Sequence, residues 1–312
     1  MRICSLLPSA TEIVFALGMG DSLVAVSHEC DYPERARHLP KVTRSRINPA
    51  ASSRQIEETV AASLQAGTAL YELELELLER IQPDLVITQG LCDVCAVSLN
   101  LLERAIPSLS SRPAVLNLEP HSLADILDDI RSVATAIGRE NAAESLLEKL
   151  NARIEWVRKR AAIVASRPRV FCMEWIDPPY CGGHWMKELV ELAGGRDDLA
   201  NDASPSYRIE WKQVIQYAPE IIVLTCCGYD LERCKREAEI LATFPGIFDL
   251  PAVKQNHVFA TAGSGYFSRP GPRIVDSLEI LAHLIHPEIF SPPALGKEVF
   301  VALTLMHAEA EA

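Results

Sequence analysis

Apolar and polar positions along the first 120 residues alternate in the pattern of strands followed by helices. The apolar run Arg2–Leu7 stops at Pro8, and the polar stretch Ser9–Glu12 is typical of the capped start of a helix that continues to Leu17. Gly18 ends that helix. The other elements predicted in this part are a strand at 23–27, a helix at 73–81 and a strand at 83–88.

The same pattern returns after residue 167. Arg169–Glu174 predicts a strand, Asp177–Gly183 a loop rich in proline and glycine, and Trp185–Leu192 a helix. A further helix at Trp211–Tyr217 leads into the apolar strand Pro219–Thr225. The chain therefore contains a degenerate internal repeat.

Strands that alternate with helices predict an α/β fold of two Rossmann-like lobes, each with a parallel sheet. Ligands of such sheets bind at the loops beyond the carboxyl ends of the strands. The loops in that position are 8–11, 28–32 and 89–95 in one lobe and 177–184, 226–230 and 262–273 in the other.

Between the lobes, helices are predicted at 121–137 and 139–166, separated by Gly138. The second has an apolar stripe, and its roughly 28 residues would run about 40 Å as a rigid strut that joins the lobes. The ligand cleft is expected between the two lobes. The tail is expected to end in a short apolar helix. The predicted ranges are an N-terminal α/β lobe at 1–120, a helical linker at 121–166, a C-terminal α/β lobe at 167–287 and the tail at 288–312.

Composition and charge restrict the classes of partner that the protein is expected to bind. The 312 residues include 48% hydrophobic and 23% charged residues, and 30 Lys and Arg against 42 Asp and Glu give a net charge of −12. The longest basic run is Arg158–Arg160, so nucleic acid is an unfavoured partner. The first residues, MRICSLLPSATEIVF, do not have the pattern of a signal peptide, and no apolar run approaches the length of a membrane span. We expect a cytoplasmic location for the chain as written, and a periplasmic or extracellular one if a leader precedes it.

Motifs of catalysis and phosphate binding do not occur in the sequence. GxGxxG, GxxxxGK[ST] and HExxH are absent. We expect a protein that is not an enzyme.

Five sequence motifs carry a resemblance to a known family. They are SLLPSATEIVFALG at 5–18, VAVSHECDYP at 24–33, PDLVIT at 83–88, DPPYCGGHWMKELVELAGG at 177–195 and SRPGPRIVDSLEIL at 268–281. Together they resemble the cobalamin-binding branch of the helical-backbone, or class III, periplasmic binding proteins, over about residues 2–287. This resemblance implies reversible capture of a corrinoid, or of haem or a ferric siderophore in sister branches, for delivery to an ABC transporter.

The resemblance also implies roles for particular residues. Tyr180 matches an aromatic that packs on the corrin ring, and Arg269 matches an arginine that contacts the ligand. Glu29 and Gln89 stand where aromatic residues are expected, while Tyr207 lies near another expected aromatic. The residues that could supply replacement stacking surface are Trp185, Tyr266 and Phe267. Of the two acidic residues that dock relatives on a transporter, Glu76 is retained and Lys212 replaces the second.

A corrinoid needs flat apolar walls and a few hydrogen-bonding groups at its rim. The candidate rim residues are Glu29, Arg46, Gln89, Asp93 and Arg269. His28 and His184 follow predicted strands, and each could offer an imidazole to cobalt or iron, or could cap a loop.

Thiols gather at two corresponding loops. Cys92 and Cys95 form a C-x-x-C pair in the first lobe, and Cys226 and Cys227 occupy the matching loop of the second. A structural zinc site usually needs a second C-x-x-C pair, which is absent. The four thiols could hold a soft metal, form a redox couple, ligate cobalt or pack beneath a ligand. A cysteine-dependent metal-binding or redox protein is thus the alternative from another class. Nine cysteines at irregular spacing fit a reducing compartment.

Overall fold

The chain forms two compact units. The computed structural model describes residues 1–90, 102, 104–296 and 298–306. The first unit comprises Met1–Ala51, Gln55–Pro120 and Ala124–Leu150. The second comprises Ser52–Arg54, His121–Leu123 and the described part of Asn151–Ala312.

The first unit is built on a parallel sheet with the strand order β2-β1-β5-β6. Its strands are β1 (Ile3–Ser5), β2 (Leu23–Val26), β5 (Leu85–Gln89) and β6 (Ala114–Leu118). β1 and β5 are buried throughout, as expected for inner parallel strands covered on both faces. A separate antiparallel ribbon is formed by β3 (Thr43–Ser45) and β4 (Tyr71–Leu73).

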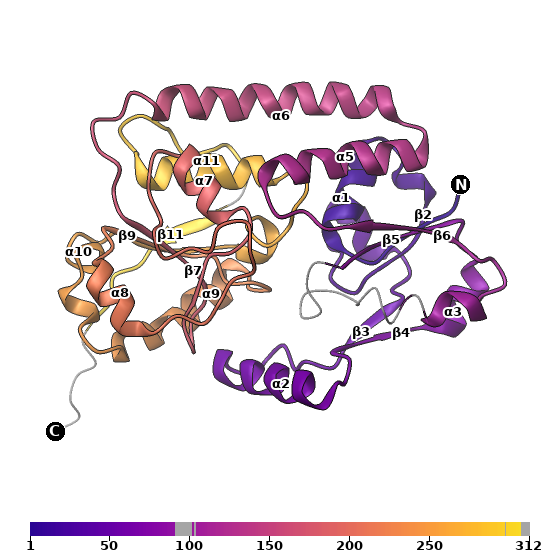
Figure 1. Cartoon of the computed structure of the whole chain (residues 1–312), viewed down its shortest axis with the longest axis horizontal. Coiled ribbons are helices and arrows are strands. Elements are labelled where there is room, and N and C mark those ends of the chain that lie inside the picture. Colours follow the sequence, from indigo (N-terminus) through magenta and orange to yellow (C-terminus); the bar gives the residue numbers. More distant parts are fainter. Residues whose placement is uncertain (91–101, 103, 297, 307–312) are drawn as a thin grey trace. The chain divides into compact units, whose positions relative to one another are not determined.

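Helices cover both faces of this sheet. They are α1 (Pro8–Ala16), α3 (Leu75–Ile81) and α5 (Leu123–Ile137), with α2 (Ser53–Ala66) beside the ribbon and α6 (Glu140–Ala161) contributing residues to both units. Leu78 of α3 packs with Cys4 and Val86 on one face. Figure 1 shows α1 and α5 on the other.

α1 begins earlier than its sequence suggests. Ser9–Glu12 was expected to cap the helix, but Pro8 already opens it and no side chain caps its N-terminus. Proline suits this first position because the N–H that it lacks has no partner within the helix. The Thr11 hydroxyl instead turns back toward Ser5 and the Leu7 carbonyl.

The second unit has a five-stranded sheet with the order β11-β10-β9-β7-β8. The strands are β7 (Val170–Trp175), β8 (Tyr180–Cys181), β9 (Ile221–Leu224), β10 (Val258–Thr261) and β11 (Phe300–Ala302). The inner strands β7, β9 and β10 are parallel, whereas β8 and β11 pair antiparallel at the edges. The predicted α/β fold with parallel strands in each half is confirmed.

The helices of the second unit lie in two layers. They are α7 (Met186–Leu192), α8 (Trp211–Tyr217), α9 (Leu231–Glu237), α10 (Pro251–Lys254) and α11 (Ile274–Ile285). In Figure 1, α7 and α11 lie side by side on one face of the sheet, with α8 and α9 on the other. Phe171, Met173 and Leu224 belong to the buried cluster that includes residues of α8 and α9.

Three local expectations are corrected. The tail forms the strand β11, not a helix, because β10 offers it an open edge and its β-branched and aromatic residues suit a strand. α6 ends at Ala161 rather than at residue 166, so it has 22 residues. The loop 177–183 contains the short strand β8. No described helix combines the length and apolar character that a membrane crossing requires.

Candidate functional site

The loops after β1 and β2 in the first unit are tied together by buried hydroxyl and thiol groups. Thr11 Oγ1 donates to Ser5 Oγ at 2.9 Å, and Cys30 Sγ lies 3.1 Å from Thr11 Oγ1 and 3.4 Å from Ser27 Oγ. Burial raises the pKa of Cys30, although hydrogen bonds from Ser27 and Thr11 oppose this. Cys30 is therefore a neutral thiol that holds the two loops together.

His28 is oriented by the β3–β4 ribbon. Its backbone N–H donates to Thr43 Oγ1 at 2.9 Å, and its Nδ1 lies 2.7 Å from the same hydroxyl. The ring lies 5.5 Å from the Tyr71 ring, centroid to centroid. Its Nε2 is buried without a hydrogen bond in the described part of the chain, although Glu29 Oε1 lies 3.3 Å away. A ring held through Nδ1 presents Nε2 in a defined direction, as metal-bound histidines do.

The remaining first-unit candidates are dispersed. Gln89 is the last residue of β5 and is buried. Arg46 is exposed and pairs with Glu72 at 2.8 Å, so its charge is already partly satisfied. Cys92, Asp93 and Cys95 lie outside the described residues.

Two aromatic rings and a guanidinium follow β7 and β9 in the second unit. Trp175 ends β7, and its ring lies 5.0 Å from that of Tyr229. The Arg233 guanidinium stands 4.0 Å from the centre of the Tyr229 ring, a cation–π distance. Sequence reasoning missed these residues. Trp175 could have been found, because it directly follows the predicted strand 169–174 and so begins a candidate ligand loop.

Residues 52–54 are held by this same edge of the second unit. Trp175 Nε1 donates to the Ser53 carbonyl at 3.1 Å, and the Ser53 backbone N–H and hydroxyl donate to Glu237 at 3.2 and 3.0 Å. Arg54 makes a bidentate pair with the nearly buried Asp177, at 2.9 and 2.8 Å. The sequence offered no signal for this anchor, because the pairing spans 123 positions.

The loop after β10 packs closely on its own unit. A Cβ on Gly263 would come 2.3 Å from a carbonyl oxygen of the loop after β9, so only glycine fits there. Tyr266, Phe267 and Arg269 are 4%, 3% and 6% exposed. Their side chains therefore support the loop and leave little free area in this conformation.

Three further candidates cluster around β8. Tyr180 is half-buried and stands opposite Trp175 in the β7–β8 register. Tyr207 is 40% exposed and donates its hydroxyl to the Leu199 carbonyl at 3.1 Å. Trp185 is buried, and its indole N–H donates to the Phe267 carbonyl at 3.1 Å. Tyr180 and Tyr207 thus keep ring area outside the core, whereas Trp185 does not.

The thiols of the second unit differ in burial. Cys226, for which metal binding, redox chemistry and packing beneath a ligand were all considered, is fully buried in the core with its Sγ 3.9 Å from the Met173 carbonyl, as the packing alternative requires. It interacts there with Cys234, and burial raises the pKa of Cys226 far above its ordinary value. Cys227 is half-buried. In the described part of the chain, no group of three or more His, Cys, Asp and Glu side chains is placed to hold a metal.

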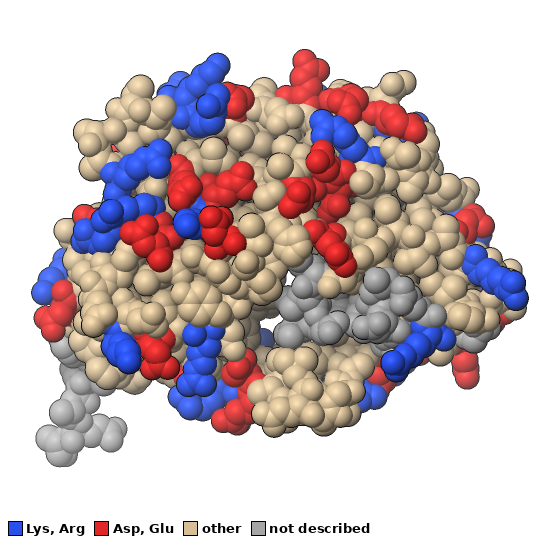
Figure 2. Space-filling model, viewed as in Figure 1, with Lys and Arg blue, Asp and Glu red and all other residues tan. Residues whose placement is uncertain are grey.

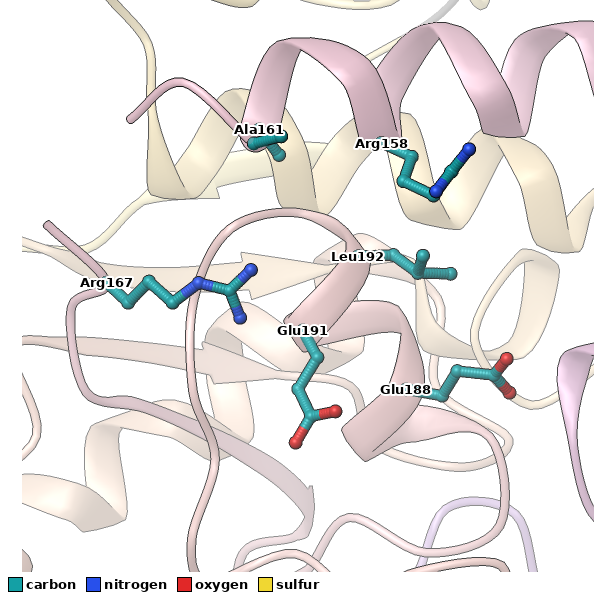
Figure 3. Close-up of a pocket in the computed structure, with 7 residues that line it drawn as sticks. Arg158, Ala161, Arg167, Glu188, Glu191 and Leu192 are labelled. Atoms are coloured by element: carbon teal, nitrogen blue, oxygen red, sulfur yellow. The ribbon is translucent and has the colours of Figure 1, made fainter. Parts of the chain in front are cut away.

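A pocket of about 290 Å³ lies between α6 and α7 in the second unit. Figure 3 shows Arg158 on α6, Arg167, and the α7 residues Glu188 and Glu191 around it. Its volume is at the lower limit of small-ligand pockets, and its lining is charged. It does not suit a large apolar macrocycle.

The docking candidates are both on surfaces. Glu76 is exposed in the first turn of α3, and Lys212 is exposed in the first turn of α8.

Comparisons with known proteins agree with this architecture. The family model described as periplasmic binding protein matches residues 3–263. The vitamin B12-binding protein of Vibrio parahaemolyticus serotype O3:K6 is 26% identical over 287 residues, covering 90% of this chain and 88% of the relative.

Solved structures show the same fold. The periplasmic vitamin B12 binding protein of Vibrio cholerae has a TM-score of 0.67 at 23% identity, covering 92% of this chain and 96% of the other. A periplasmic heme binding protein from Pseudomonas aeruginosa has a TM-score of 0.73 at 17% identity, covering 98% and 99%. The matched family model spans most of the chain, and the chain therefore belongs to the periplasmic binding protein family.

Proposed function

We propose that the chain is a non-catalytic substrate-binding protein that captures a corrinoid of the cobalamin type. The observation that carries this proposal is the carboxyl edge of the second unit, where the half-buried rings of Trp175 and Tyr180 stand opposite each other and the buried Tyr229 ring supports Trp175 and Arg233. Flat rings suit a corrin face, and a guanidinium suits the amide oxygens at its rim. The vitamin B12-binding relative, aligned over 90% of this chain, supports the same ligand class.

Titration with hydroxocobalamin tests this proposal, with the visible spectrum and calorimetry as two independent signals. We expect saturable binding of one corrinoid per chain. Absence of binding at roughly tens of micromolar ligand would refute the proposal.

Two variants, one at Tyr180 and one at Trp156, test which surface of the second unit binds the corrinoid. Tyr180→Ala should weaken corrinoid binding by about tenfold or more, since aromatic packing contributes on the order of 1 kcal/mol beyond buried area. Trp156→Ala is the matched control, because Trp156 is an exposed aromatic on α6 of the same unit. Equal losses in both variants would remove the assignment of Tyr180 to the ligand surface.

Haem, or a ferric siderophore, is the second candidate ligand. Haem is favoured by two imidazoles with a buried nitrogen that makes no hydrogen bond in the described part of the chain, His28 Nε2 and His184 Nδ1. Imidazole is a common ligand of haem iron. Titration with hemin should give a shifted Soret band that His28→Ala or His184→Ala abolishes. An unchanged band in both variants would leave no role for either ring in iron ligation.

Delivery to an ABC importer would place one contact on each unit. Glu76 on α3 offers a carboxylate, whereas Lys212 on α8 offers a cation, so a partner surface would need an arginine or lysine opposite Glu76 and an acid opposite Lys212. Stimulation of a candidate importer's ATPase in proteoliposomes tests this. Lys212→Glu should reduce the stimulation if an acidic residue of the transporter contacts Lys212. It should raise the stimulation if the transporter has a basic residue at that position.

A further inference from the structure

Two histidines of the second unit lie next to each other in space although they are 63 positions apart. His121 belongs to the short segment His121–Leu123, and His184 precedes α7. Their ring centroids are 5.8 Å apart and the rings are tilted by 43°. His121 was not among the candidates predicted from the sequence, because nothing in the pattern indicates that residue 121 returns to α7.

The segment that carries His121 is fixed to α7. The Leu123 backbone N–H donates to Glu188 Oε2 on α7 at 2.8 Å, and the Leu123 side chain is buried. His121 itself is exposed to solvent. Its imidazole is therefore held near α7 but remains accessible from outside.

His184 is fixed more tightly. Its backbone N–H donates to the Ser204 carbonyl at 2.6 Å, and its φ of +52° is left-handed, an unfavourable conformation for a residue with a side chain. Its ring stacks on Trp185 at 5.5 Å and 27°, and the Trp185 indole is held by the Phe267 carbonyl. The ring orientation is thus determined before any ligand arrives.

The Nδ1 atom of His184 is buried and makes no hydrogen bond with the described residues. A buried polar nitrogen without a partner is costly, so such a group calls for a ligand. Burial, and then the nearby His121, lower the pKa of His184. The geometry by itself makes His184 Nδ1 an available donor atom for a metal ion.

We propose that His121 and His184 bind one divalent transition metal ion, of the Zn²⁺, Cu²⁺ or Ni²⁺ class. Nitrogen–metal bonds of about 2.0–2.1 Å place the centres of two imidazoles on one ion roughly 5 to 6.5 Å apart, and the observed separation lies in that range. Because no third His, Cys, Asp or Glu joins them among the described residues, water completes the coordination. This site goes beyond the proposed capture of a macrocycle and does not depend on it.

Metal titration without any macrocycle tests the pair. The protein carries Cys92→Ser and Cys95→Ser, so that this thiol pair does not compete. Calorimetry with Zn²⁺ should give one equivalent bound, and His121→Asn and His184→Asn should each weaken binding by at least about tenfold, the scale at which even outer-shell partners act. His257→Asn is the matched control, an exposed histidine of the same unit, and should bind as the parent does.

Electron spin-echo measurements on the Cu²⁺ form give a second readout that counts imidazoles. Two coupled rings are expected in the parent and one in either single variant. Circular dichroism establishes that each variant is folded, and His121→Asn lies at an exposed position that the fold tolerates. Parent-like affinity in both variants, or a Cu²⁺ spectrum with fewer than two imidazoles in the parent, would overturn the proposal.

Discussion

The two units are both built on parallel strands, but the loops that follow these strands carry different kinds of side chain. In the described part of the first unit, small hydroxyl and thiol groups link the loops after β1 and β2, with Ser5, Thr11 and Cys30 at the centre. In the second unit, the loops after β7 and β9 are joined by rings and charges, as at Trp175 and Tyr229. The parallel sheet positions the loops, and the residues in the loops decide what each edge can bind.

This difference assigns unequal roles to the two units. Buried hydroxyl networks make a loop rigid but leave few groups to contact a ligand. Aromatic rings that are only partly buried, such as those of Trp175 and Tyr180, offer stacking area. We therefore expect the second unit to offer more stacking area to a flat ligand than the first unit does.

Asp197 offers the largest test of how the second unit is held together. Its buried carboxylate accepts the backbone N–H groups of Cys172, Leu199 and Ala200 at 3.0, 3.1 and 3.1 Å. Asp197→Ala would remove the acceptor of one buried and two partly buried N–H groups, which should lower the free energy of unfolding by roughly 3 kcal/mol. Urea denaturation followed by tryptophan fluorescence measures this unit selectively, because all four tryptophans lie in it.

Asp198→Ala is the control for that measurement. Asp198 is the exposed neighbour, and its removal should change the unfolding midpoint little. Similar losses of unfolding free energy in the two variants would mean that the three backbone contacts of Asp197 do not stabilise the second unit.

Thr11 gives the corresponding test in the first unit. Thr11→Val keeps the shape of the side chain but removes the hydroxyl that links Ser5 and Cys30, and should lower the stability of this unit by about 1 to 2 kcal/mol. Hydrogen exchange at β1 amides measures the effect. Thr59→Val on α2 removes an exposed hydroxyl and should leave β1 unchanged. Unchanged exchange at β1 in Thr11→Val would contradict the network.

Arg54 tests the anchor of residues 52–54 on the second unit. Arg54→Gln removes the bidentate pair with Asp177, but the arginine side chain is 65% exposed, so the global loss should stay at or below about 1 kcal/mol. Faster amide exchange in the first turn of α2 is the sharper signal. Arg158→Gln is the control, because it removes a comparably exposed arginine that pairs with Glu155, and it should not affect that turn. Unchanged exchange in Arg54→Gln would show that Ser53 alone holds it.

The sequence predicted the alternation of strands and helices because apolar periodicity is a local signal. Trp211–Tyr217 was predicted with its observed ends. Anchors such as Arg54 with Asp177, and neighbours such as His121 with His184, depend on tertiary contacts between distant positions, which one sequence does not show. Burial was equally hidden. Cys226 and its neighbour Cys227 are indistinguishable by position, yet Cys226 alone of the two is fully buried.

The roles predicted from the resemblance remain predictions. Tyr180 and Arg269 lie on the second unit, the first half-buried on β8 and the second buried. Glu29 and Gln89 lie on the first unit, where the Glu29 backbone N–H donates to Ser27 Oγ at 3.3 Å. Binding measurements on single variants of these four residues would show how unequal the two edges are.

The smallest expected effect compares one acid in each unit under a change of pH. Asp129 lies on α5 of the first unit, where Figure 2 shows acidic side chains gathered. Its Oδ2 is buried and makes no hydrogen bond in the described part of the chain, and burial, followed by the charges of Asp125 and Asp128, raises its pKa to about 7. Burial likewise raises the pKa of Asp197 to about 7, although three N–H donors oppose the shift.

A raised pKa in the folded state has a defined sign. The folded protein binds more protons than the unfolded chain between about pH 4 and pH 7, so this contribution to stability is greatest below about pH 4, declines across that interval and is lost above pH 7. Asp129→Asn removes this loss: its melting temperature should converge with the parent's near pH 4 and should exceed it by more at pH 8 than at pH 5. Glu148→Gln, an exposed change on α6 of the same unit, should not reproduce that difference. Asp197→Asn should instead lower the melting temperature at both pH values, because an amide has one oxygen to accept three N–H groups. If the melting temperature of Asp129→Asn equalled the parent's at both pH 5 and pH 8, the buried Asp129 carboxyl would not destabilise the first unit. The contrast between a destabilising acid in the first unit and the stabilising Asp197 in the second would then be wrong.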